Sequence, residues 1–154
     1  MTQAIVAGAI AVATVNLLAG LLGAWLWYDG DPGERAAANF WLLLRAGQGA
    51  ALVLALAAGS LAAAGNYSTD HLFYLYALLP LAVGFVAEQL RVASAQTILD
   101  QHELPDAQAV GALPEREQLS IVRGIVRREI GVMALSALVV VFLALRAAGT
   151  AHGF

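Results

Sequence analysis

The residues best suited to chemistry are polar side chains that interrupt otherwise apolar segments. Arg45 lies inside one such segment, and Glu88 lies near the end of another. A guanidinium and a carboxylate in apolar surroundings are stable when they pair, and ionisable residues inside membrane segments are candidates for function. We therefore predict an Arg45–Glu88 pair between neighbouring segments. The full cluster expected at this level is Arg45, Gln48, Glu88, Arg91, Arg128 and Glu129. Two interpretations stay open: a functional charge cluster, or charges that only anchor segment ends.

A second set of residues is suited to lining a cavity. Asn16 lies mid-way along the first apolar segment, and Tyr74 and Pro80 lie in the third. An amide side chain among apolar residues bonds across a helix interface or faces a ligand. Pro80 removes one backbone donor and frees the Tyr76 carbonyl, which predicts a kink. The alternative is that all these residues serve only tight helix packing.

Several chemistries have no residues to support them. The chain contains no cysteine, which excludes disulfides, thiol redox chemistry and iron–sulfur clusters. It has no Gly-x-Ser-x-Gly motif and no phosphate-binding glycine loop. Asp70 and His71, joined by His152, could orient a metal or a proton relay, but so few ligands do not favour a metal site, and the chain lacks the two facing histidines that a haem needs. We expect no catalytic residues, no metal and no cofactor, and we favour a protein that is not an enzyme.

The elements that position these residues are long apolar helices. Of 154 residues, 60% are hydrophobic and 12% are charged, whereas a soluble domain has about 25% charged residues. About 20 apolar residues cross a bilayer as a helix. The sequence predicts four such spans, at about 4–28, 39–64, 71–91 and 128–147. The predicted fold is all-α: a single domain over 1–154, an integral membrane four-helix bundle.

The third and fourth spans are expected to continue beyond the membrane as a helical hairpin at about 92–127. This segment is more polar, and Pro114 followed by Glu115 suits the first turn of a helix. It also contains apolar residues that would not face lipid: Ile98, Leu99, Leu119, Val122 and Ile125. Either these residues pack on one another, or they form a docking surface for a partner.

Arginine placement predicts the orientation. Loops one and three and the adjoining span ends hold seven of the eight arginines, and the opposite side holds only Arg146. Cytoplasmic loops carry the excess of basic residues. We therefore place both loops in the cytoplasm and both termini outside, in a bacterial inner membrane. The seven are Arg35, Arg45, Arg91, Arg116, Arg123, Arg127 and Arg128.

One segment is similar to a known family. With four predicted spans and outward termini, Arg45-Ala46-Gly47-Gln48 resembles an Arg-Ala-containing segment of the MAPEG group of glutathione-handling membrane enzymes. The Asn and Glu expected downstream are replaced by 49–53, and loop three is longer than in that group. We base no function on this resemblance.

Three hypotheses for function follow. The first is a non-enzymatic membrane protein, either an accessory or scaffold subunit or a binder of a small ligand, expected to be oligomeric. The alternative is a small transporter or channel that uses the polar face from Asn16 to Glu88. The third is an enzyme acting on a lipophilic substrate. Expected partners are membrane lipids and a second copy or another membrane protein. Nucleic acid is not expected, since the net charge is −3.

Overall fold

The protein is an elongated bundle of helices. The computed structural model describes residues 1–30 and 33–153, with only the backbone described for Ala107. Its helices are α1 (Thr2–Asp29), α2 (Glu34–Ala63), α3 (Leu72–Gln101), α4 (Ala107–Val110) and α5 (Glu115–Thr150). No strand occurs in the described residues, which confirms the predicted all-α class. The predicted turn at 29–33 includes Asp31 and Pro32, which lie outside the described residues.

Four of these helices, α1, α2, α3 and α5, are long and apolar enough to cross a membrane, as predicted. Helices α3 and α5 extend into the segment at 92–127, where a helical hairpin was predicted, whereas α1 and α2 begin before their predicted spans. For example, α2 begins at Glu34, five residues before Asn39. Alanine-rich sequence and an acidic residue in the first turn both favour helix there. Hydropathy therefore located the apolar part of each helix but not its ends.

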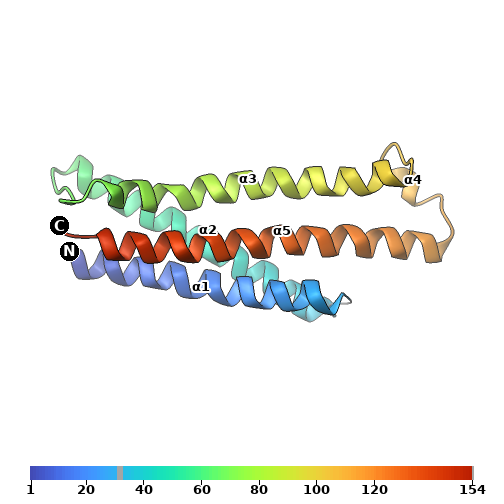
Figure 1. Cartoon of the computed structure of the whole chain (residues 1–154), viewed down its shortest axis with the longest axis horizontal. Coiled ribbons are helices and arrows are strands. Elements are labelled where there is room, and N and C mark those ends of the chain that lie inside the picture. Colours follow the sequence, from blue (N-terminus) through green and yellow to red (C-terminus); the bar gives the residue numbers. More distant parts are fainter. Residues whose placement is uncertain (31–32, 154) are drawn as a thin grey trace.

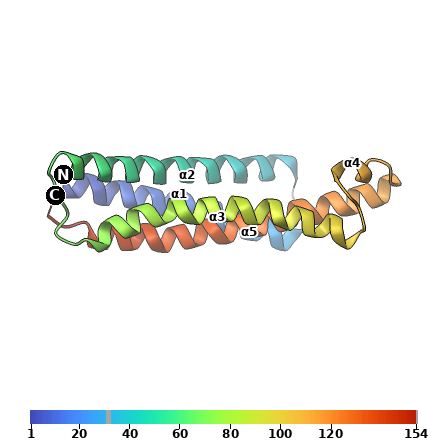
Figure 2. The ribbon, with the colours of Figure 1, turned by 90° about the horizontal axis from the view of Figure 1, so that it is seen from above.

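Helix α5 organises the bundle. It packs along α1 on one side and α3 on the other, whereas α2 packs mainly along α1 and more sparsely along α3. The two termini and the α2–α3 connection lie together at one end, and α4 lies at the other (Figures 1 and 2). We call these the termini end and the α4 end. Helices α3 and α5 extend toward the α4 end beyond α1 and α2.

Two hydrophobic clusters hold the four helices together. Near the termini end the helices meet through small side chains, with Ala9, Ala144 and Ala147 all fully buried. Nearer the α4 end, the ring of Phe40 is fully buried against Gly23. A Cβ at Gly23 would lie 2.5 Å from Cε2 of Phe40, so only glycine permits this approach. Close packing of this kind holds helices together where burial from water contributes little.

The extension beyond α1 and α2 has a small core of its own. Ile98 and Leu99 from α3 are buried against Val110 of α4 and Ile121 of α5. The interpretation in which the extensions pack on each other is thus supported for part of the predicted set. Ile125 is half-buried, but Leu119 and Val122 remain 50% and 49% exposed. Val110 was not predicted as part of this core, because the four residues of α4 are too few to show helical periodicity.

Two residues that affect the geometry of α3 are Asp70 at its start and Pro80 within it. The Asp70 carboxylate accepts a hydrogen bond from the backbone N–H of Leu72 at 2.9 Å, which satisfies a donor in the first turn. The helix continues through Pro80 without interruption as far as Gln101. Pro80 is buried, so the ring lies inside the bundle rather than against its surroundings.

Candidate functional site

A cavity of about 220 Å³ lies between α2 and α3, toward the middle of the bundle. These two helices pack more sparsely against each other than α1 and α2 do. All four long helices contribute to its lining. Most of that lining is apolar, with four polar side chains: Asn16, Gln48, Glu88 and Ser136. Such a chamber, with few polar groups in an apolar wall, is the usual form of a small-molecule site.

Asn16 provides the buried polar group of the cavity. Its side chain is only 2% exposed, and its Nδ2 donates to the Val12 carbonyl at 2.9 Å in the same helix. Gly47 of α2 lies directly against this amide: a Cβ there would lie 2.7 Å from Nδ2 and 2.8 Å from Oδ1. No hydrogen bond between helices to this amide occurs in the described residues. The amide therefore keeps unused hydrogen-bonding capacity beside the cavity.

An ion pair lies at the mouth of the cavity toward the α4 end. Nη1 of Arg45 lies 2.5 Å from Oε1 of Glu88, so the predicted pair is present. The same Nη1 donates to Oε1 of Gln48 at 2.7 Å. Arg45 and Gln48 are three residues apart in α2 and therefore share a face. The guanidinium of Arg45 thus joins α2 to α3 where these two helices pack only sparsely.

Arg91 extends this network toward α5. Its Nε lies 3.1 Å from Oε2 of Glu88, an electrostatic contact whose angle does not make a hydrogen bond. Its Nη1 lies 3.9 Å from Oε2 of Glu129. The guanidinium also lies over the ring of Trp41, 5.5 Å from the centroid, in a cation–π contact. Two arginines and two glutamates therefore balance to zero formal charge.

The structure separates two of the predicted residues from the others. Arg128 makes no ion pair with these four side chains and instead lines a groove between α1 and α5. Tyr74 lies near the termini end, where its hydroxyl accepts a hydrogen bond from the Ser68 backbone at 3.0 Å. Asn16 and Pro80 both line the cavity.

Most of the lining, including Gly47, Gly84 and Ser136, was not predicted from the sequence. Gly47 and Gly84 provide space on facing helices, but glycine is frequent in this chain and marks no single position. Ser136 had a usable signal, because it is the only hydroxyl residue in the uncharged run at 130–145. In the structure its Oγ donates to the Met133 carbonyl at 2.8 Å.

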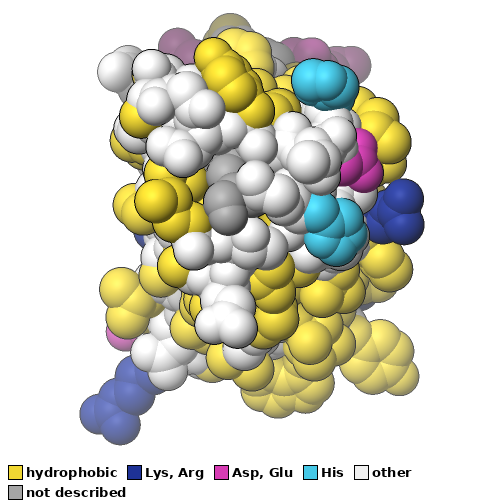
Figure 3. Space-filling model, turned by 90° about the vertical axis from the view of Figure 1, so that its left-hand side faces the viewer, with side chains coloured by type: hydrophobic (Ala, Val, Ile, Leu, Met, Phe, Trp, Pro, Cys, Tyr) yellow, Lys and Arg dark blue, Asp and Glu magenta, His cyan; other side chains and the backbone are white. Residues whose placement is uncertain are grey.

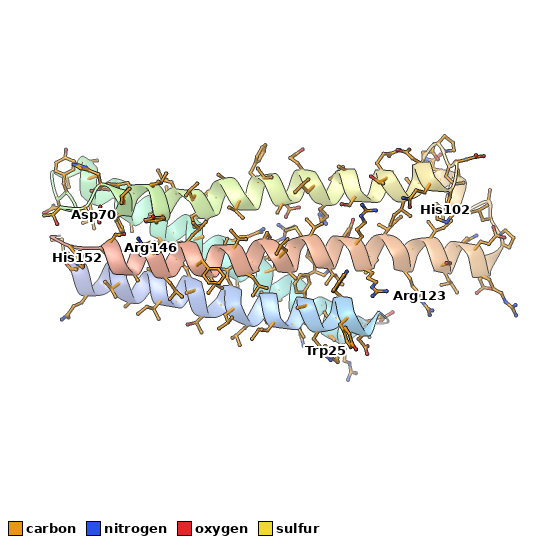
Figure 4. The ribbon with its side chains drawn as sticks, in the orientation of Figure 1. Trp25, Asp70, His102, Arg123, Arg146 and His152 are labelled. Carbon is orange, nitrogen blue, oxygen red and sulfur yellow. The ribbon has the colours of Figure 1, made fainter. Side chains whose placement is uncertain are left out.

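The termini end holds the other concentration of polar side chains. Figure 3 shows two histidines near an acidic side chain on this end of the molecule. Asp70 and His152 both lie there, whereas His102 lies at the α4 end (Figure 4). Within the described residues no three His, Asp or Glu side chains are grouped to hold a metal ion. This end is instead held by structural bonds, such as the one from the Thr69 backbone to the His152 carbonyl at 2.9 Å.

The cavity presents several hydrogen-bonding groups within an apolar wall. Its amide, hydroxyl and carboxylate groups can position the polar part of a molecule whose remaining surface is apolar. The nearby guanidinium of Arg45 is already occupied by Glu88. Comparison with protein-family models, with curated proteins and with solved structures finds no match for this chain.

Proposed function

We propose that this protein is a non-catalytic, multi-pass protein of a bacterial inner membrane that binds a small amphiphilic molecule between α2 and α3. The observation that carries the proposal is the buried Asn16 amide beside an apolar cavity. An amide removed from water without full hydrogen bonding destabilises a protein by roughly 1–3 kcal/mol. A ligand carbonyl or hydroxyl would satisfy it.

The surface of the bundle supports the membrane location. Large apolar side chains point outward on every long helix, among them Leu42, Phe85 and Phe142 with 70%, 67% and 71% exposure. Contiguous apolar surface on this scale needs a partner or lipid to cover it. The shortest of the four, α1, has 28 residues, or about 42 Å at 1.5 Å per residue. A bilayer core is about 30 Å thick.

The arginine distribution supports an orientation with the α4 end in the cytoplasm and the termini outside. We expect alkaline phosphatase fused after residue 154 to be active. A fluorescent protein that folds only in the cytoplasm should stay dark at the same position. The same reporters inserted in the loop at 102–106 should give the opposite pattern. An inactive phosphatase and a fluorescent reporter protein at the C-terminus would together contradict the orientation.

Packing favours a binder over a channel. Between the cavity and the termini end, the bundle is filled by buried residues that include Val12, Phe73 and Val141. Phe73 is fully buried and Val12 is 1% exposed. A transporter would need a path through this region, and its side chains are close-packed. The cavity is accordingly a pocket that opens between α2 and α3.

The nature of the lining indicates the class of ligand. The ion pairs at the mouth have no net formal charge, which gives no electrostatic preference for an ion. The interior offers neutral hydrogen-bonding groups from Asn16 and Ser136 within an apolar wall. A neutral amphiphile with one carbonyl or hydroxyl group matches both features.

Two glycine substitutions test the site. A Cβ at Gly84 would have only Nε2 of Gln48 nearby, at 4.0 Å, so Gly84→Leu should fill the cavity without displacing backbone. Gly49 on α2 is exposed, and nothing lies within 4 Å of its Cβ position, so Gly49→Leu is the matched control. Mass spectrometry of organic extracts should find a near-stoichiometric neutral amphiphile with the wild type and Gly49→Leu. We expect at least about ten-fold less with Gly84→Leu, since 1.4 kcal/mol of lost binding is ten-fold.

The protein for this test is purified from its own membranes in nanodiscs. Equal recovery from the two leucine variants would contradict the cavity as the binding site. Absence of any enriched amphiphile from the wild type would contradict the binding function itself.

A further inference from the structure

A second concave surface, separate from the cavity between α2 and α3, lies between α1 and α5. This groove has a volume of about 430 Å³. It begins at Trp27 and Arg128 and follows α5 through Val132 and Leu135 to Leu138. From Arg128 to Leu138 the groove is about 15 Å long, at 1.5 Å per residue. That length accommodates a large part of one acyl chain.

The walls of the groove are fixed in place by close helix contacts. At one end the indole of Trp27 lies against Gly131, where a Cβ would come within 2.8 Å of Cδ1. Nε of Arg127 donates to the Trp27 carbonyl at 2.9 Å, and its guanidinium lies 5.6 Å from the indole centroid. At the other end, Leu138 packs against Gly20. The groove is therefore preformed.

Positive charge is concentrated at the Trp27 end. Arg128 lines the groove and is exposed, and no carboxylate of residues 1–30 or 33–153 forms an ion pair with it. Its neighbour Glu129 faces Arg91 on the other side of α5. Exposed Trp25, Trp27 and Tyr28 mark this level as the interface between lipid and water.

A second groove on the same helix provides an internal comparison. Between α3 and α5 lies a groove of about 380 Å³ that is lined only by apolar residues and Ser136. Both grooves would contact acyl chains in a membrane. Only the α1–α5 groove ends at a guanidinium, so only this one combines an apolar trough with a site for a phosphate.

We propose that the α1–α5 groove binds an anionic phospholipid of the leaflet nearest the α4 end. The phosphate contacts Arg128, and one acyl chain lies along Val132 and Leu135. Basic pockets between membrane helices on the cytoplasmic side bind such lipids. Here the charge of Arg128 matches the phosphate, and the shape of the groove matches an acyl chain. This inference uses the membrane location proposed above but does not depend on a ligand between α2 and α3.

Native mass spectrometry of the full chain tests the proposal. The protein is released from nanodiscs that contain equal amounts of phosphatidylglycerol and phosphatidylcholine, and the retained lipids are counted. We expect the wild type to keep one phosphatidylglycerol in preference to phosphatidylcholine. Arg128→Gln should reduce this preference about ten-fold, because glutamine keeps a hydrogen-bond donor but loses the charge that strengthens its bond to a phosphate. Arg116→Gln is the control, as an exposed arginine of the same helix outside the groove.

A second measurement locates the acyl chain. Phosphatidylglycerol brominated on its acyl chains should quench tryptophan fluorescence more in the wild type than in Trp27→Phe. Brominated phosphatidylcholine should show a much smaller difference between the two proteins. Equal phosphatidylglycerol retention by Arg128→Gln and Arg116→Gln would overturn the proposal. A dimer that Arg128→Gln dissociates would also overturn it, because a second copy would then occupy the groove.

Discussion

Replacement of Phe40 by alanine is expected to lower the free energy of unfolding by about 3 kcal/mol, at the lower end of the range for buried aromatic residues. The ring of Phe40 is fully buried where α1, α2 and α5 meet, against Gly23 and near Ala134. Its loss leaves a cavity that these short side chains cannot fill. In a bilayer the transfer from water contributes little, so the loss comes chiefly from packing contacts.

Phe142→Ala is the matched control for this prediction. Phe142 lies on α5 and is 71% exposed, so its ring faces the surroundings of the bundle. We expect its removal to change stability by less than about 0.5 kcal/mol, as for other surface substitutions. Both variants can be measured by unfolding in mixed micelles with increasing SDS. Equal destabilisation by the two substitutions would contradict the packing described for Phe40.

Separation of the Arg45–Glu88 pair should produce the second large effect. Glu88 contacts both Arg45 and Arg91, whereas Arg45 has only one carboxylate partner within the described residues. The Glu88 side chain is 26% exposed and that of Arg45 is 52% exposed. Loss of one partner destabilises a buried pair by about 3–5 kcal/mol and an exposed pair by at most about 1 kcal/mol. We expect about 2–3 kcal/mol for Glu88→Leu and about 1 kcal/mol for Arg45→Leu.

The double variant separates pairing from independent effects. Arg45→Leu combined with Glu88→Leu should be about 1 kcal/mol more stable than the sum of the single changes, because the double change leaves neither Arg45 nor Glu88 without the other. The measurement is the same SDS unfolding series. Arg35→Leu is a suitable control, since Arg35 is exposed near the start of α2 and makes no ion pair in the described residues. Additive single effects would contradict energetic coupling between the two helices.

The Arg45–Glu88 pair was predictable because depth along a helix follows directly from residue number. Each residue advances a helix by 1.5 Å, so two polar residues at similar distances from their helix ends lie at similar levels. The cavity residues Asn16 and Pro80 were predictable for the same reason, because both lie near the middle of their predicted spans. Tyr74 is six residues from Pro80 and therefore about 9 Å further along α3, outside the cavity.

The position of Arg128 was not predictable in this way. Arg128 and Glu129 lie at the same depth but point in directions about 100° apart around α5. Glu129 faces Arg91, and Arg128 lines the α1–α5 groove. The rotation of α5 about its own axis decides which neighbouring helix each of these two side chains faces. Within the uncharged run at 130–145, apolar residues occur on every side of α5, so this part of the sequence gives no charged face that would indicate the rotation.

Four long apolar helices, their approximate positions and the level of the main charge cluster could all be predicted from sequence alone. These properties depend on hydropathy and on the constant rise of the helix, which are local. The tertiary structure decided the neighbours: α5 between α1 and α3, and α2 more loosely against α3. It thereby placed the cavity beside Asn16 and the groove beside Arg128. The physical reason is that helix neighbours are selected by close contacts such as Gly23 with Phe40 and Gly131 with Trp27, between residues far apart in the chain.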